Sequence, residues 1–508
     1  MPKALVSVSD KHGLAGFARG LKRLGYELYA TGSTLKSIQD AAIDAHPVTE
    51  LTGFPEMMDG RIKTLHPGVH AGILARRDRP EHMESLKQHH LEEIDLVCCN
   101  LYPFVETVTR REVTFEEAIE QIDIGGPTMI RAAAKNHESV VVVVRPERYS
   151  EVLGALSERT LDLAFRRRLA AEAFAHTSAY DSWIAAYMRG SETNGFPPEL
   201  SFAGLLTQQL KYGENEHQKA AFYRFGPDPG GLGGAAQVQG KDLGFNNIQD
   251  ASAAYQLVRD YDKPAAAIGK HMNPCGLAVA DDIATAYRLA YECDTVSAFG
   301  GVVAVNRPLD RSTAEQIVQI VTHVVIAPEV LDEAKDVLAR RKTMIVLAAE
   351  PPRAGLLDFD VRSVPGGFLV QEWDRLGFDR STVIVVTRRA PTEVEWEQLG
   401  FAWTAVKHVK SNAIVLFKDG AAVGVGAGQM SRVEAVQIAV RRAGGRAVGS
   451  VMASDAFFPF ADGLEEGIRA GVTAVIQPGG SVKDAEVVAA ADAAGIAMVV
   501  TGQRHFKH

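Results

Sequence analysis

Residues 4–42 read ALVSVSDKHGLAGFARGLKRLGYELYATGSTLKSIQDAA, and short apolar runs alternate there with helical patterns. This stretch predicts strand, helix, strand and helix in that order, over Ala4–Val8, Leu14–Leu24, Tyr26–Ala30 and Thr34–Ala42. Two further apolar runs that contain β-branched residues follow at Ile94–Cys99 and Val140–Val144. Continuous apolar strands that alternate with helices are typical of a parallel sheet covered on both faces. The first 150 residues therefore predict an α/β domain.

The clearest linker pattern lies between a predicted long helix and a second α/β region. Residues 161–188 predict the helix, since no Gly or Pro interrupts them. Arg189–Pro198, RGSETNGFPP, cannot continue that helix because it is polar and carries two glycines and a Pro pair. We therefore predict domains at 1–190 and 200–508. The second domain again alternates helices with strands, expected at Ala265–Ile268, Val302–Val305, Ile345–Leu347, Ala413–Phe417, Val472–Ile476 and Met498–Thr501.

Two features of the second region bear on its organisation. Residues 267–272, AIGKHM, resemble residues 447–452, AVGSVM, and chance explains so short a match as well as duplication does. A true duplication would indicate two similar α/β halves with the active-site residues in the first. The Gly-rich run Gly424–Gly428 lacks the last glycine of a dinucleotide-binding fingerprint, because Gln429 stands there. We predict a turn at that run.

The composition argues against several classes of protein. The 508 residues include 54 Lys and Arg against 63 Asp and Glu, a formal net charge of −9. This balance disfavours a nucleic-acid partner but not small anions, because a few local cations can hold a phosphate. No secretion signal or apolar run of membrane-spanning length is apparent, and four cysteines lack disulfide or metal spacing: Cys98, Cys99, Cys275 and Cys293. These features predict a cytoplasmic protein without a membrane partner.

Four loops of the first domain carry side chains suited to an anionic ligand. Thr31–Thr34 opens a helix, where backbone N–H groups can meet an anion; a plain N-cap turn explains it equally well. Arg61–Gly68, RIKTLHPG, groups two cations and a hydroxyl that can grip a phosphate or oxyanion, with a solvated basic loop as the alternative. Cys99–Phe104 and Asp123–Pro127 are loops of the kind in which open α/β sheets place functional residues.

A Lys–His pair follows the predicted strand Ala265–Ile268. Lys270 can stabilise an oxyanion and His271 can transfer a proton, while the alternative is an ordinary surface turn. A zinc deaminase would need a P-C-x-x-C motif, and Pro274–Cys275 lacks the second cysteine because Ala278 stands there. No zinc is therefore expected.

Taken in order along the chain, these motifs match those of one known family. The ordered set is Ser9–Lys11, Arg61–Thr64, Asn100–Phe104, Asp123–Pro127, Lys135–Asn136, Lys211–Asn215, Lys270–His271, Ser454–Phe460 and Arg504–Phe506. Over essentially its whole length the chain resembles the family of bifunctional purine biosynthesis proteins. That family joins 5-aminoimidazole-4-carboxamide ribonucleotide (AICAR) formyltransferase to inosine monophosphate (IMP) cyclohydrolase.

The resemblance implies a methylglyoxal-synthase-like N-terminal domain with a parallel sheet, which closes formyl-AICAR to IMP with loss of water. Its substrate pocket would comprise Ser9, Asp10, Lys11, Thr31, Gly32, Ser33, Thr34, Arg61, Ile62, Thr64, Cys99, Asn100 and Ile124. The positions with catalytic roles would be Lys63, Tyr102, Asp123 and Lys135.

The resemblance also implies a C-terminal domain of two cytidine-deaminase-like halves, which transfers the formyl group of 10-formyltetrahydrofolate to AICAR. His271 would take the proton from the AICAR amine, and Lys270 would assist at the formyl oxygen or the folate N10. The AICAR-binding positions would be Lys211, Tyr212, Gly300, His323, Asn412, Arg432, Phe457 and Arg504. The positions near the folate would be Val433, Asp462, Ser481 and Val482. The family resemblance suggests a homodimer with transferase sites at the subunit interface. Whether the chain binds a monovalent cation is left open by the sequence.

Three residues depart from the family pattern. Lys211 stands where Arg is usual, which turns a bidentate grip into a point charge. Glu216 replaces a Pro, and His323 replaces the carboxylate expected to meet the substrate. Lys211 and His323 motivate a second hypothesis, a nucleotide-sensing regulator that keeps the pockets without the chemistry. The third hypothesis, a zinc deaminase, predicts tightly bound zinc.

Overall fold

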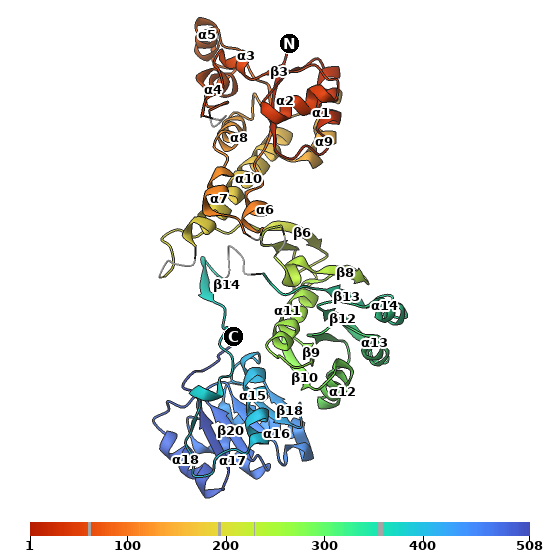
Figure 1. Ribbon diagram of the computed structural model, residues 1–508, viewed down its shortest axis with the longest axis vertical. Helices are drawn as coiled ribbons and strands as arrows, with labels where there is room; N and C mark the ends of the chain where they lie inside the picture. The colour runs from red at the N-terminus through yellow and green to blue at the C-terminus, as the bar shows by residue number, and fades with distance from the viewer. Residues whose placement is uncertain (59–61, 111, 191–194, 228, 354–358) are drawn as a thin grey trace. The chain divides into compact units, whose positions relative to one another are not determined.

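The computed structural model describes residues 1–58, 62–110, 112–190, 195–227, 229–353 and 359–508. The chain divides into two compact units, Met1–Gly204 and Leu205–His508. In Figure 1 the first unit is coloured red to yellow and the second green to blue. Both units contain a β-sheet with helices, which confirms the predicted α/β class. Within the described ranges, no helix is long and apolar enough to cross a membrane.

Unit 1 is built on a five-stranded sheet in the order β3-β2-β1-β4-β5. Its strands are β1 (Lys3–Val8), β2 (Glu27–Ala30), β3 (His46–Pro47), β4 (Leu96–Asn100) and β5 (Val141–Val143). Every neighbouring pair is parallel, as the alternation of strands and helices predicts. Because the strand order reverses between β1 and β4, their carboxyl ends border the crevice where open α/β sheets bind ligands.

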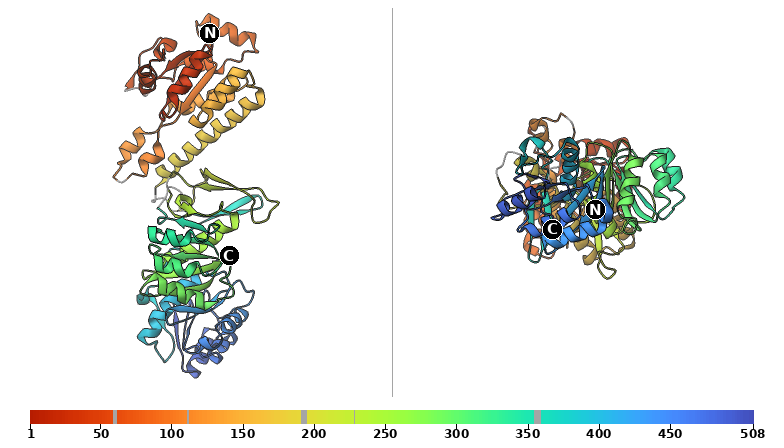
Figure 2. Two further views of the ribbon diagram at one scale, coloured as in Figure 1. Left: turned by 90° about the vertical axis from the view of Figure 1, so that its right-hand side faces the viewer. Right: turned by 90° about the horizontal axis from the view of Figure 1, so that it is seen from below.

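Helices connect the strands of unit 1. The shorter ones are α1 (Leu14–Arg23), α2 (Gly32–Asp40), α3 (Thr49–Thr52), α4 (Pro67–Leu74), α5 (Pro80–Gln88), α6 (Phe104–Val108), α7 (Phe115–Glu120), α8 (Gly125–Lys135) and α9 (Tyr149–Glu158). The longest, α10 (Leu163–Arg189), has 27 residues and is seen in yellow in the left-hand view of Figure 2. The buried residues of α1 recur at helical spacing, which explains why this segment folds as it does: Leu14, Phe17, Ala18 and Leu21. The helices predicted over Leu14–Leu24 and 161–188 agree with α1 and α10 to within two residues.

Unit 2 contains a twelve-stranded sheet in the order β16-β21-β20-β19-β17-β18-β10-β9-β11-β12-β13-β8. Its strands are β8 (Ala236–Gln239), β9 (Ala265–Lys270), β10 (Asn273–Val279), β11 (Gly301–Val305), β12 (Thr322–Ala327), β13 (Ile345–Ala348), β16 (Ile384–Val385), β17 (Ile414–Lys418), β18 (Ala421–Gly426), β19 (Val451–Ser454), β20 (Ala474–Gln477) and β21 (Ala497–Val500). Two separate hairpins pair β6 (Leu205–Leu210) with β7 (Ala220–Arg224) and β14 (Phe359–Val364) with β15 (Gly367–Glu372). The helices are α11 (Phe245–Arg259), α12 (Ile283–Cys293), α13 (Arg311–Ile317), α14 (Asp332–Leu338), α15 (Glu393–Lys407), α16 (Arg432–Ala443), α17 (Ala461–Arg469) and α18 (Asp484–Ala493).

This sheet is symmetric about its central strands, β10 and β18. Next to β10 and β18 lie their hairpin partners, β9 and β17. Three mutually parallel strands follow on each side, β11-β12-β13 and β19-β20-β21, and each side ends in an antiparallel edge strand, β8 or β16. Individual hydrogen bonds repeat in the two halves as well. In the first half Asn306 accepts from the Ala265 N–H, and at the corresponding place in the second half Asp455 accepts from the Ala413 N–H. Unit 2 is therefore a duplicated α/β fold.

The sequence match that suggested duplication is wrong in its register. Residues 267–272 belong to β9 and its turn, and the counterpart of β9 is β17. Residues 447–452 run from a short 3-10 helix into β19, whose counterpart is β11. Short runs of small and β-branched residues suit any packed strand, so a match of this length does not establish which strands correspond.

The turn predicted at Gly424–Gly428 is also wrong, because Gly424 and Gly426 lie inside β18. Helix α16 approaches this strand so closely that a Cβ on Gly426 would overlap the carbonyl oxygen of Ala435. Glycine in a strand commonly marks such a close approach of another backbone. The glycines therefore serve helix packing rather than a turn.

Gly426→Ala is expected to lower the free energy of unfolding of unit 2 by about 1–3 kcal/mol, because β18 or α16 must shift to admit the methyl group. Equilibrium unfolding in urea measures the loss. Gly445→Ala is the matched control, since nothing lies within 4 Å of a Cβ at that position. Equal stability changes in the two variants would contradict the packing explanation.

Candidate active sites

One side chain ties together the carboxyl ends of β1 and β4. The Oδ1 of Asn100 accepts from the Ser9 N–H at 2.6 Å and the Asp10 N–H at 2.9 Å. Its Nδ2 donates to the Asp10 carbonyl at 3.1 Å, and the Lys11 ammonium lies 3.3 Å from the Ser9 carbonyl. An amide suits this place because it both donates and accepts. Asn100 therefore fixes the Ser9–Lys11 loop at the edge of the crevice.

The start of α2 lies at the same edge of the sheet. Thr31 is the N-cap residue, and its Oγ1 lies 2.8 Å from the Ser7 Oγ. Thr34 Oγ1 accepts from the Val8 N–H and donates to the Val8 carbonyl. These bonds hold the helix start against β1. The Thr34 N–H already donates to the Thr31 carbonyl at 2.9 Å, whereas the N–H groups of Gly32 and Ser33 precede the first helical bond, so this helix start is suited to an anion.

Lys63 lies beside the start of α2. A Cβ on Gly32, whose φ is 36°, would lie 3.2 Å from the Lys63 Nζ. The same ammonium lies 3.6 Å from Glu56 Oε2, and the Lys63 side chain is 26% exposed. A cation that converges with a helix N-terminus favours a phosphate or a developing oxyanion.

The loop before α8 carries Asp123. Its Oδ1 accepts from the Gly126 N–H at 2.8 Å, which fixes the carboxylate at the first turn of the helix. Thr64 lies against the same turn, since a Cβ on Gly125 would lie 2.6 Å from the Thr64 Oγ1. The loops that carry Lys63 and Asp123 are therefore adjacent.

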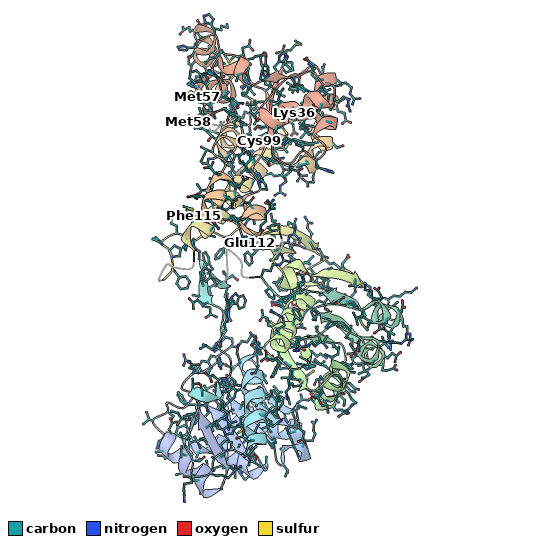
Figure 3. All side chains as sticks on the ribbon, in the orientation of Figure 1. Lys36, Met57, Met58, Cys99, Glu112 and Phe115 are labelled. Carbon is teal, nitrogen blue, oxygen red and sulfur yellow. The ribbon has the colours of Figure 1, made fainter. Side chains whose placement is uncertain are left out.

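Burial determines the protonation of three groups at this edge. It raises the pKa of Asp123 above the ordinary carboxyl value, against the N–H groups of Gly126 and Gly125, which lower it. Burial and then the Asp123 charge raise the pKa of Tyr102 and, much further, of the Cys99 thiol, which is labelled in Figure 3. Tyr102 and Cys99 are therefore neutral at pH 7, whereas the Asp123 pKa moves toward the range useful for proton transfer.

The other predicted residues of this site differ in their placement. Ile62 and Ile124 are exposed apolar side chains, at 36% and 59%. Arg61 lies outside the described residues. Lys135 ends α8, about 15 Å along the helix axis from Gly125, so the structure places it at the opposite end from Asp123. Its catalytic role stays a prediction.

Sequence reasoning missed one residue of this site, Tyr180 on α10. Its hydroxyl accepts from the Asp123 N–H and donates to the Gln121 carbonyl, both at 2.9 Å. Tyr180 thus fixes the backbone of the Asp123 loop to α10. It lies 57 residues along the chain from Asp123, and no local pattern marks it.

In unit 2, a two-residue turn between β9 and β10 presents His271. His271 and Met272 have φ of 54° and 62°, the left-handed region that a type I′ hairpin turn requires. The His271 side chain is exposed, and the Lys270 Nζ donates to the Phe299 carbonyl at 2.9 Å. Holding non-glycine residues in this region costs about 1–3 kcal/mol each, a strain that clusters at functional sites.

Gly300 and His323 lie close to Lys270. A Cβ on Gly300, whose φ is 71°, would lie 3.3 Å from Cε1 of His323. Burial, followed by the charges of Lys241 and Lys270, lowers the pKa of His323. His323 is therefore neutral at pH 7 and offers one N–H donor and one acceptor where the family resemblance leads us to expect a carboxylate.

A buried guanidinium lies at the start of α16. Arg432 donates to Asp455, to the Ala413 carbonyl at 3.1 Å and to Asn412 Oδ1 at 2.8 Å. Its Nε is buried and has no hydrogen-bond partner among the described residues. An unpaired buried donor is unfavourable unless a ligand or water meets it. The Arg432 cluster is therefore suited to an anionic or carbonyl group of a ligand.

Asn273 connects the His271 turn to the Arg432 cluster. Its Nδ2 donates to the His271 carbonyl at 3.1 Å, and its Oδ1 accepts from the Lys410 N–H at 3.0 Å. Lys410 stands two residues before Asn412. The site is thus built where the hairpin of the first half meets the second half.

The predicted folate positions lie near the carboxyl edge of β19 and β20. Val433 and Asp462 lie in the first turns of α16 and α17, and Ser481 and Val482 precede α18. Phe457, which follows β19, is 38% exposed. Ligands bind at this edge in doubly wound sheets.

The remaining predicted AICAR positions are Lys211 and Tyr212, which follow β6, and Arg504 near the C-terminus. Lys211 lies 5.7 Å from the centre of the Tyr212 ring, and Arg504 lies 4.6 Å from that of Phe506. These contacts do not connect the three residues with His271, and their contact with AICAR stays a prediction.

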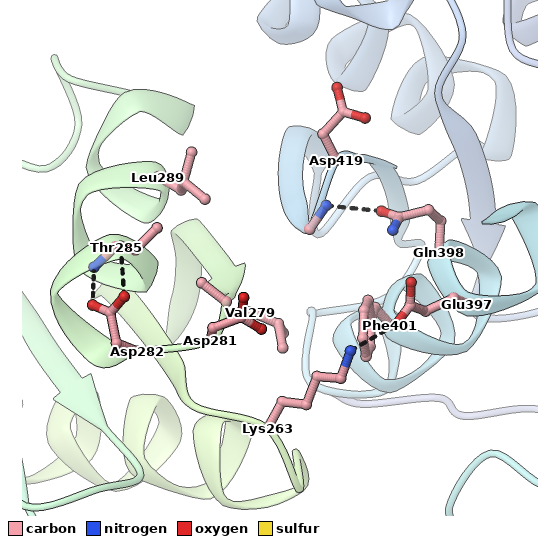
Figure 4. Close-up of a pocket in the computed structure, with 12 residues that line it drawn as sticks. Lys263, Val279, Asp281, Asp282, Thr285, Leu289, Glu397, Gln398, Phe401 and Asp419 are labelled. Carbon is pink, nitrogen blue, oxygen red and sulfur yellow. Dashed lines mark hydrogen bonds and ion pairs between the residues drawn. The ribbon is translucent and has the colours of Figure 1, made fainter.

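A cavity of about 350 Å³ lies at the other hairpin, between β17 and β18 (Figure 4). The duplication makes it the counterpart of the His271 site, because Asp419 and Gly420 form the corresponding turn. Lys263 in its lining is paired with Glu397 at 2.7 Å. The other charged lining residues are carboxylates: Asp281, Asp282 and Asp419. This lining does not suit a phosphate, so the His271 site is the stronger candidate.

Known proteins are similar to this chain over its whole length. A family model described as AICARFT/IMPCHase bienzyme matches residues 133–442, and one described as MGS-like domain matches residues 13–128. The bifunctional purine biosynthesis proteins PurH of Thermoanaerobacter sp. and Bacillus subtilis are each 49% identical, covering 100% of this chain and 99% of the relative. The PurH protein of Parvibaculum lavamentivorans is 51% identical, covering 100% and 97%. The crystal structure of ForH matches 38% of this chain and 100% of its own at 33% identity, with a TM-score of 0.34.

Proposed function

The chain belongs to the AICARFT/IMPCHase bienzyme family, and from this premise we propose which residues perform its two reactions. It is a bifunctional enzyme of purine biosynthesis with AICAR formyltransferase and IMP cyclohydrolase activities. The proposal assigns ring closure to the predicted domain 1–190 and formyl transfer to 200–508. The observation that carries it is the connection between the His271 turn and the Arg432 cluster: Asn273 hydrogen-bonds both the turn and the Lys410 N–H, and the backbone leads from Lys410 to Asn412, which accepts from Arg432.

In the proposed formyl transfer, the amine nitrogen of AICAR attacks the formyl carbon of 10-formyltetrahydrofolate. A bond forms between these atoms, the bond from the carbon to folate N10 breaks, and the amine proton passes through His271 to N10. His271 acts as the general base from its exposed position on the turn. Lys270 stabilises the oxyanion or the leaving N10. Asn412 and the free Nε of Arg432 hold AICAR, with His323 as a neutral hydrogen-bonding partner.

In the proposed ring closure, the carboxamide nitrogen of formyl-AICAR attacks its formyl carbon, and water leaves after the new C–N bond forms. Asp123 moves the protons, and Tyr102 and Lys63 stabilise the formyl oxygen as it becomes negative. The Thr31–Thr34 and Ser9–Lys11 loops hold the nucleotide. The convergence of Lys63 with the start of α2 supports this placement.

Ring closure is expected to slow as the pH falls through the pKa of Asp123, because a general base must be ionised. Burial raises that pKa above its ordinary 3.8, so the acid limb of kcat/KM for formyl-AICAR should have its midpoint above 3.8. Samples returned to neutral pH before assay separate titration from unfolding. A midpoint at or below the ordinary value would contradict the proposed role of Asp123.

A two-step assay on the purified chain tests the function. AICAR and 10-formyltetrahydrofolate should yield tetrahydrofolate and IMP. Nucleotide binding in calorimetry without either product would instead support the nucleotide-sensing alternative, and tightly bound zinc in metal analysis would support the deaminase.

The proposal extends to a cytoplasmic homodimer, which the family resemblance suggests. Sedimentation at micromolar concentrations should give twice the chain mass of 54.8 kDa. A monomer at those concentrations would contradict this part of the proposal.

A further inference from the structure

We propose that Asp250 is a positioning residue for formyl transfer, acting through the turn that carries His271; this rests on the role proposed for His271 above. Asp250 lies on α11, and its Oδ1 accepts from the Met272 N–H at 2.7 Å. Met272 is the second residue of the turn, so the bond holds the backbone directly after His271.

The duplicated half contains the corresponding bond with different chemistry. Gln398 occupies on α15 the position that Asp250 occupies on α11, in helices of 15 residues each. Its Oε1 accepts from the Gly420 N–H at 2.9 Å. The lysine that begins the turn is also repeated, since Lys418 donates to a backbone carbonyl at 2.8 Å as Lys270 does at 2.9 Å. A bond from helix to turn is therefore common to both halves.

The two turns place different demands on that bond. Asp419–Gly420 suits the left-handed region, because Asp tolerates positive φ and Gly adopts it freely. His271 and Met272 adopt the same conformation without a glycine, at φ of 54° and 62°. The first turn therefore depends more on an outside partner. A carboxylate such as Asp250 is a stronger acceptor for this purpose than the amide of Gln398.

The position of the turn matters for the rate of the reaction rather than for substrate binding. A general base works only when it lies within hydrogen-bond reach of the proton that it removes. Loss of the Asp250 bond would let the turn relax and move the His271 ring away from the amine. The contacts of the Arg432 cluster would remain, so kcat should fall while the KM for AICAR changes little.

Three single variants of the full-length chain separate positioning from general stability. Asp250→Ala is expected to lower kcat for formyl transfer by about 10²-fold, with KM for AICAR within about threefold of wild type. Asp250→Asn keeps an acceptor oxygen, although a weaker one, and should lower kcat by less than about tenfold. Gln398→Ala, the matched control, removes the corresponding bond from the half without a histidine and should also retain kcat within about threefold.

A double variant tests the conformational reason and covers the case in which Asp250→Ala folds poorly. Met272→Gly removes the side chain that disfavours positive φ, so in the Asp250→Ala background it is expected to recover kcat by about tenfold. Ring closure of supplied formyl-AICAR, measured in each variant, shows that the chain is otherwise intact.

Several results would overturn the proposal. These are wild-type kcat in Asp250→Ala, an equal loss in Gln398→Ala, a loss in Asp250→Asn as large as in Asp250→Ala, or no recovery in the double variant. Failure of the underlying function is distinguishable, because His271→Ala would then retain formyl transfer. If His271→Ala is inactive while Asp250→Ala is active, only the positioning role of Asp250 is refuted.

Discussion

The His271→Ala variant is expected to lose formyl transfer by about 10²–10⁴-fold while it still converts supplied formyl-AICAR to IMP. The imidazole is the exposed titratable group on the turn, and the neighbouring Lys270 is a cation that cannot accept the amine proton. Ring closure should persist because its proposed residues belong to unit 1, a separate compact unit. Tetrahydrofolate release measures the first reaction and IMP formation from formyl-AICAR measures the second.

The duplicated hairpin supplies a matched control for this experiment. Asp419 has a φ of 51° and stands in its turn where His271 stands in the other. Asp419→Ala should therefore disturb a turn of the same geometry and leave formyl transfer within about threefold of wild type. Loss of both reactions in a folded His271→Ala protein would contradict the two-site arrangement, and equal losses in the two variants would indicate damage to the sheet.

The elements of unit 1 could be predicted from the sequence because periodicity and burial agree there. Val6 lies in a parallel strand that is buried on both faces, and Ala4, Leu5 and Val8 of the same strand are apolar and buried as well. The register of the duplication in unit 2 could not be predicted in this way. It is expressed in strand order and in repeated hydrogen bonds such as those of Asn306 and Asp455, which local sequence does not encode.

The residues of the candidate sites also fall into two groups, those that local sequence could predict and those that only the fold identifies. Asn100, Lys63 and His271 stand at the ends of strands or in loops beside them, where both chemistry and position are readable from the sequence. Tyr180 and Asp250 act through backbone N–H groups of distant loops, so only the folded chain identifies them. The motif Ser454–Phe460 included Asp455, but its partner Arg432 lies 23 residues earlier along the chain, and only the fold pairs them.

The second large effect is expected in unit 1, where Lys63→Ala should lower ring closure by about 10²–10³-fold and leave formyl transfer intact. The variant should therefore convert AICAR to formyl-AICAR and accumulate it, because the product of the first reaction is no longer consumed. Chromatography of the nucleotides over time measures this accumulation directly. The physical reason is the loss of the ammonium beside the start of α2, where the proposed oxyanion develops.

Stability cannot account for an effect of that size. The ion pair of Lys63 with Glu56 is 3.6 Å long and partly exposed, and such pairs contribute about 0–1 kcal/mol. Lys36 on α2, labelled in Figure 3, is an exposed lysine of the same unit, and Lys36→Ala should leave ring closure within about threefold of wild type. If Lys63→Ala closed the ring at the wild-type rate, the charge that balances the formyl oxygen would have to come from another group. Lys11 would then be the first to test, because its ammonium lies 3.3 Å from the Ser9 carbonyl at the same edge of the sheet.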